Sequence, residues 1–94
     1  MAGTRAVRLL IKGRVQGVGY RDWAIDEARA LGLNGWVRNL RSGEVEALIS
    51  GPEAAVDRMI ESCRRGPSIA RVADIEITPA APPPDPGFRR LPTA

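Results

Sequence analysis

The sequence predicts an α+β fold in which two amphipathic helices cover one face of an antiparallel sheet. The first observation is the order of the predicted elements, which is strand, helix, strand, strand, helix, strand. The second is that apolar residues alternate with polar ones in the strand segments and recur every three or four residues in the helical segments. The third is the length of 94 residues, which suits one core between two layers. We therefore expect a single domain over residues 1–94.

The first half of the chain is predicted to form a strand, a helix and a β-hairpin. Apolar and charged residues alternate in the strand segment, as in a strand with one buried face. Apolar residues at helical spacing follow, and Gly32 is a typical C-terminal stop. Two strand-like runs are then joined by a short loop that contains Gly43. The predicted ranges are about 5–13 for the strand, about 21–31 for the helix, and 35–40 and 44–50 for the hairpin.

The second half is predicted to form a helix and a long strand. Pro52 suits the first position of the helix, and the pair Gly66-Pro67 suits its end. The strand covers about residues 69–78. Its apolar phase slips in the middle, which predicts a β-bulge near Ala73.

The C-terminal segment is predicted to reach the edge of the sheet. Residues 79–87 form a proline-rich extended loop, and residues 88–91 are predicted to add a short edge strand. Without this tail the element order is β-α-β-β-α-β, which is the order of the ferredoxin-like sandwich. We therefore predict a ferredoxin-like two-layer sandwich with an antiparallel sheet and two helices on one face.

The composition limits the chemistry available to the protein. The chain contains no histidine, so it lacks the commonest general base and the commonest metal ligand. Its net charge is +3, and Lys12 is its only lysine, so arginine supplies nearly all of the positive charge. Arginine binds carboxylates and phosphates in a two-pronged fashion, which permits an anionic ligand. The carboxylates are scattered along the sequence, so we expect no metal site and no cofactor.

We expect a cytoplasmic monomer without a membrane partner. No apolar run reaches the ~18 residues of a membrane span, and the N-terminus lacks the pattern of a signal peptide. Cys63 is the only cysteine, which rules out an internal disulfide and fits a reducing compartment.

The segment GRVQGVGYR, residues 13–21, lies between the first strand and the first helix. Its three glycines permit positive φ angles and close approach of the backbone to a ligand. Backbone N–H groups at a helix N-terminus attract anions, and Arg21 adds a cation at the same place. The alternative is a glycine-rich turn followed by a solvated arginine, and this segment alone does not decide between the two. It matches neither a P-loop nor a dinucleotide fingerprint.

A second block, GWVRNLRSGEVEALISG, follows at residues 35–51. The two blocks, in this order and separation, resemble the acylphosphatase family over about residues 5–78. The resemblance implies the ferredoxin-like fold and hydrolysis of the carboxyl–phosphate bond of acyl phosphates. It also implies that Arg21 binds the phosphate and that Asn39 orients the attacking water. The phosphate-binding loop that it implies is lined by backbone N–H groups of Gln16, Gly17, Val18, Gly19 and Tyr20.

Hydrolysis of an acyl phosphate needs neither histidine nor a metal ion. The leaving carboxylate has a conjugate acid with a pKa of about 4, so no general acid is required. The transition state spreads charge over the phosphoryl oxygens, which Arg21 and the loop amides stabilise. The amide of Asn39 is no base, but it holds a water in line, and a phosphate oxygen of the substrate takes the proton.

The alternative function is a ferredoxin-like binding or regulatory module, for RNA or in a carbamoyl-phosphate system, without catalysis of its own. RNA-binding sheets of this fold present aromatic residues on their central strands. This chain has only two tryptophans, one tyrosine and one phenylalanine, and none lies in the first predicted strand. We therefore expect a small-molecule acyl phosphate as the partner and no nucleic acid.

Overall fold

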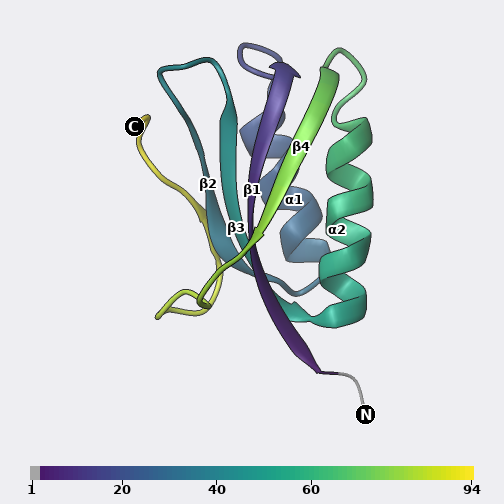
Figure 1. Ribbon diagram of the computed structural model, residues 1–94, viewed down its shortest axis with the longest axis vertical. Helices are drawn as coiled ribbons and strands as arrows, with labels where there is room; N and C mark the ends of the chain where they lie inside the picture. The colour runs from purple at the N-terminus through teal and green to yellow at the C-terminus, as the bar shows by residue number, and fades with distance from the viewer. Residues whose placement is uncertain (1–2) are drawn as a thin grey trace.

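The computed structural model describes residues 3–94, which form a sheet and a layer of two helices (Figure 1). The elements are β1 (Thr4–Arg14), α1 (Tyr20–Ala30), β2 (Asn34–Asn39), β3 (Val45–Pro52), α2 (Glu53–Arg65), β4 (Arg71–Pro79) and β5 (Phe88–Arg90). The predicted order of elements is confirmed, and the arrangement is the ferredoxin-like sandwich. No helix within the described residues is long and apolar enough to cross a membrane.

The five strands lie in the order β4-β1-β3-β2-β5. The four long strands pair antiparallel, as predicted, whereas β5 pairs parallel to β2, so the sheet is mixed. The path of the chain explains this difference. β4 ends at the end of the sheet where β2 begins, and residues 80–87 carry the chain to the other edge at that same end (Figure 1). β5 must then run in the direction of β2.

The predicted bulge lies in β4. The register of β1 against β4 shifts between Lys12 and Gly13, and Ala73 is the extra residue. Gly13 has a φ of 125°, and a Cβ atom at this position would lie 2.1 Å from the carbonyl oxygen of Arg71. The close approach of the two backbones at the bulge therefore requires glycine.

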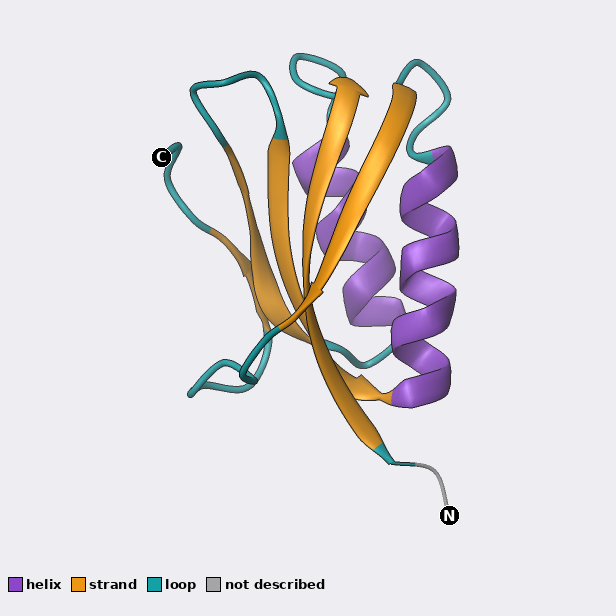
Figure 2. Cartoon of the chain, viewed as in Figure 1, coloured by secondary structure: helices purple, strands orange, loops and turns teal. Residues whose placement is uncertain are grey.

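The core lies between the helices and the covered face of the sheet (Figure 2). α1 packs on β2 and β5, and α2 packs on β1, β3 and β4. Alternate residues of the two central strands are buried: Val7, Leu9 and Ile11 on β1, and Val45, Ala47 and Ile49 on β3. The apolar stripe of α2 includes Cys63, which fills the core as a small side chain, and burial raises the pKa of its thiol to about 12.

Both helices begin one residue away from their predicted starts. α1 begins at Tyr20 because Gly19 is its N-cap, and α2 begins at Glu53 because Pro52 is the N-cap and still pairs with Thr4 in the sheet. Pro52 thus ends β3 and directs the chain into the helix, rather than being the first helical residue.

Candidate active site

The glycine-rich loop and the β2–β3 turn lie at the same end of the sheet (Figure 1). A cleft of about 80 Å³ lies between them and the start of α1. Its lining residues are Val15, Gln16, Gly17, Gly19, Tyr20, Arg21, Asp22, Asn39 and Arg90. Of the seven site residues named from the sequence, six line this cleft, whereas the side chain of Val18 is buried in the core. The fold thus brings the two sequence blocks together in one place.

The backbone of the loop needs glycine at two positions. Gly17 has a φ of 74° and Gly19 a φ of 75°. A Cβ atom at either residue would meet nothing within 4 Å, so the requirement comes from the left-handed backbone and not from space. Gly19 is also the N-cap of α1, and its carbonyl accepts a 3.1 Å hydrogen bond from the N–H of Trp23. Within residues 3–94 no side chain caps this helix, which leaves its first N–H groups for an anion.

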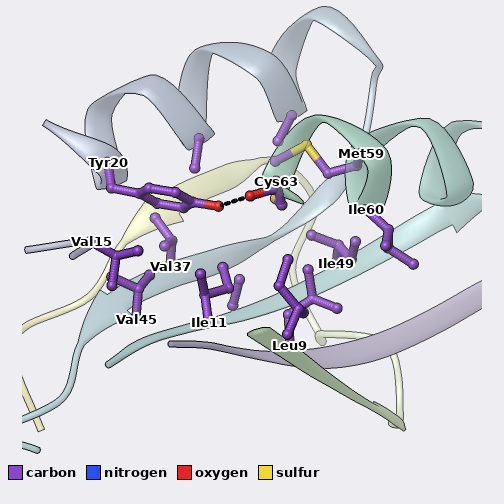
Figure 3. Packing of buried hydrophobic residues seen from close by; sticks show 14 of the residues in the cluster. Leu9, Ile11, Val15, Tyr20, Val37, Val45, Ile49, Met59, Ile60 and Cys63 are labelled. Atoms are coloured by element: carbon purple, nitrogen blue, oxygen red, sulfur yellow. Dashed lines mark hydrogen bonds between the residues drawn. The ribbon is translucent and has the colours of Figure 1, made fainter. Parts of the chain in front are cut away.

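Apolar side chains of the loop hold it on the core. Val15 and Val18 are buried. Gly17, which lies between them, and Gly19, which follows Val18, are exposed. Tyr20 is buried as well, and its hydroxyl donates a 2.6 Å hydrogen bond to the carbonyl of Cys63 on α2 (Figure 3). Because the side chains of Val18 and Tyr20 point into the core, these two residues offer only their backbone to a ligand.

The side chain of Gln16 connects the loop to the hairpin. Its Nε2 donates hydrogen bonds to the carbonyl of Leu40 at 2.7 Å and to the carbonyl of Glu44 at 2.8 Å. Leu40 directly follows Asn39, which is the last residue of β2. Gln16 therefore fixes the distance between the glycine-rich loop and Asn39.

Arg21 is half-buried in the first turn of α1 and lines the cleft together with Asn39. It takes part in none of the ion pairs between residues 3–94. A cation here is unfavourable for the helix dipole by about 0.3–1 kcal/mol, and an anion bound in the cleft would reverse this effect.

A sequence model of acylphosphatases matches residues 7–90. The chain belongs to the acylphosphatase family. An acylphosphatase of Azorhizobium caulinodans is 58% identical over 87 residues, which are 92% of this chain and 94% of the relative. One of Rhodospirillum rubrum is 55% identical over 83 residues, which are 88% of this chain and 91% of the relative. The crystal structure of a Bacillus subtilis acylphosphatase is 34% identical and aligns with a TM-score of 0.87 over 95% of this chain and 99% of that one.

Membership in the acylphosphatase family confirms the predicted resemblance, the ferredoxin-like fold and the prediction of an acylphosphatase hydrolase. It does not favour the alternative of a binding or regulatory module without catalysis. The roles of the individual residues stay predictions.

Two features of this acylphosphatase cleft were not predicted from the sequence. One is the bridging side chain of Gln16, for which only the backbone N–H was expected to act. The other is an ion pair at the rim, where Nη1 of Arg90 lies 3.2 Å from Oδ1 of Asp22. A glutamine inside a glycine-rich loop was a usable signal for the first feature. The second joins the start of α1 to β5 and has no local signature in the sequence.

The arginines of the open sheet face do not line the cleft. Arg8 and Arg38 both bind the carboxylate of Glu46, and Arg38 also lies over the ring of Trp36 at 4.9 Å from its centre. Burial raises the pKa of Glu46, but the hydrogen bonds from the two arginines outweigh this effect and lower its pKa below the usual value. The single carboxylate of Glu46 offsets one of the two arginine charges, and the group lies on the far side of the sheet from the helices.

Proposed function

We propose that this acylphosphatase cleaves the carboxyl–phosphate bond of acyl phosphates by direct attack of a water, without a metal ion. The observation that carries this proposal is the single cleft that Arg21, Asn39 and the glycine-rich loop line together. The products are a carboxylate and inorganic phosphate.

The loop and Arg21 bind the phosphoryl group. Left-handed Gly17 and Gly19 curl the backbone, and the uncapped start of α1 adds further N–H donors and the positive end of the helix dipole. The guanidinium of Arg21 supplies a full charge and a two-pronged contact to the phosphate oxygens. These donors stabilise the charge that spreads over the phosphoryl oxygens in the transition state.

Asn39 places the attacking water. Its carbonyl oxygen accepts a hydrogen bond from the water and its amide group donates one, which holds the water in line with the bond that breaks. A phosphoryl oxygen of the substrate takes the proton of the water as the new oxygen–phosphorus bond forms. The acyl oxygen leaves with the electron pair of the broken bond as a carboxylate, which needs no proton at neutral pH.

Hydrolysis of acetyl phosphate in the presence of a chelator tests this function. We expect the wild-type protein to be active, Arg21→Ala to lose binding and rate, and Asn39→Ala to lose mainly kcat. Loss of one principal donor of this kind costs about 2.7–4 kcal/mol, or about 10²- to 10³-fold in kcat.

Arg58→Ala and Asn34→Ala are matched controls, because Arg58 is exposed on α2 and Asn34 begins β2, and neither lines the cleft. If the two cleft variants keep the activity of these controls, the assigned roles are wrong. A wild-type protein that is inactive without added metal contradicts the metal-independent reaction.

We also propose that the enzyme acts as a monomer in the cytoplasm, as a single domain over residues 1–94 and without a nucleic-acid partner. Arg21, Asn39 and the glycine-rich loop already meet within one chain, which supports a site that a single copy can form. Light scattering during size-exclusion chromatography should give the mass of one chain, 10.1 kDa. A dimer mass at assay concentration would contradict this proposal.

A further inference from the structure

Arg90 reaches the cleft from β5, the short strand at the edge of the sheet. Side chains alternate along a strand, and Phe88 of β5 is buried in the core next to α1. Arg90, two residues further, lies on the same face and lines the cleft with Arg21 and Asn39. Arg89 lies on the opposite face beside Trp36.

The cleft is too small to enclose a whole substrate. Its volume of about 80 Å³ is far below the roughly 300–1,000 Å³ of pockets that enclose small molecules. If the phosphoryl group occupies the loop, the acyl chain must lie across the rim. Arg90 and Asp22 line the cleft and are exposed to solvent, as residues at its rim are.

The ion pair between Arg90 and Asp22 is weak, so another anion can replace Asp22 as the partner of Arg90. The side chains of Arg90 and Asp22 are 48% and 70% exposed, and they are joined by one contact of 3.2 Å. Exposed pairs of this kind contribute little, because solvent screens both charges. An arginine carries five N–H donors, so Arg90 keeps donors for a second anion. Asp22, if released, is already largely hydrated.

We infer that Arg90 binds a second negative charge on the acyl part of the substrate, so that the enzyme prefers acyl phosphates whose acyl chain carries a carboxylate. This inference rests on the proposed binding of the phosphate by the loop and Arg21. Asp22 holds Arg90 in place when the acyl chain is neutral, and the substrate carboxylate replaces Asp22 when the chain is anionic.

Succinyl phosphate and butyryl phosphate test this specificity, because both have four-carbon acyl chains and differ in the charge at the far end. The wild-type enzyme should show a kcat/KM for succinyl phosphate that is about two- to fivefold higher, mainly through KM, as expected for one exposed ion pair. The preference should fall as salt is added. Arg90→Gln should bring the ratio close to one, and Arg90→Lys should restore part of it.

Arg89→Gln is the matched control, since it removes the same charge from the neighbouring position on the other face. It should keep the wild-type ratio. Asp22→Asn removes the competing carboxylate and should raise the preference for succinyl phosphate. The inference is overturned if the wild-type enzyme has no preference, or if Arg90→Gln and Arg89→Gln give the same ratio. Failure to hydrolyse either substrate would instead overturn the proposed function, and this inference with it.

Discussion

Removing the side chain of Gln16 tests how the two sides of the cleft are held together. Gln16→Ala loses two hydrogen bonds, of 2.7 and 2.8 Å, to the carbonyls of Leu40 and Glu44. Each carbonyl keeps a backbone donor, because Leu40 accepts from the N–H of Gly43 and Glu44 accepts from the N–H of Leu40. The turn itself should therefore persist, and the loss should fall on the contact between the turn and the loop.

The size of the effect follows from these two hydrogen bonds. At about 0.5–1.5 kcal/mol each, they contribute about 1–3 kcal/mol. If all of this energy serves to hold Asn39 against the bound phosphate, kcat falls by about 5- to 150-fold. KM should change less, because Arg21 and the loop amides stay in place. Steady-state kinetics with acetyl phosphate measure the loss of kcat, and urea unfolding measures any loss of stability.

Gln16→Glu keeps the length of the side chain but removes the donor, since a carboxylate only accepts hydrogen bonds. It should lose at least as much kcat as the alanine variant. Ser42→Ala is the control in the same turn, because it removes only the exposed hydrogen bond from Ser42 to the side chain of Glu44. Positioning by Gln16 is refuted if Gln16→Ala has the kcat of Ser42→Ala, even if it is less stable.

Two further predictions concern the loop and the open sheet face. Gly19→Ala forces a side chain into a φ of 75° and should lower the free energy of unfolding in urea by about 1–2 kcal/mol. It should also weaken binding of inorganic phosphate. Gly3→Ala is the control, because Gly3 has no positive φ, and it should have neither effect. Glu46→Gln should destabilise the protein at neutral pH by about 1–2 kcal/mol, because the carboxylate that Arg8 and Arg38 hold is removed. Since the pKa of Glu46 is lowered in the folded state, its contribution is present above its ordinary pKa and is lost as pH falls through the lowered value. The difference between wild type and variant in urea unfolding should therefore shrink in acid, and an equal difference at every pH would contradict it.

Most of the fold was predictable because its causes are local. Alternation and helical spacing are read from neighbouring residues, and so is the phase slip that marks the bulge at Ala73. The parallel direction of β5 was not predicted, because it depends on which end of the sheet the proline-rich loop crosses. This is a property of the path of the chain in space, and no pattern within residues 88–91 records it.

The candidate site also has a part that local sequence predicts and a part that depends on long-range contacts. Arg21, Asn39 and the glycines stand in two recognisable blocks, so the sequence was sufficient to name them. The contacts of Gln16 with the β2–β3 turn and of Arg90 with Asp22 join segments that are far apart in the sequence. Such pairs form only when the elements pack, so they could be found only from the structure.

The bulge at Ala73 also affects how two copies of the protein meet. It lies on β4, which is one free edge of the sheet. A regular free edge offers unpaired backbone groups to strands of other molecules and promotes aggregation. Here the bulge breaks the regular spacing of those groups. Exposed Asp74 next to it adds a negative charge to the edge, whereas the carboxylate of Glu76 pairs with Lys12 on β1. A second copy that approaches this edge meets an irregular backbone, so the bulge that requires Gly13 also hinders edge-to-edge association of two copies.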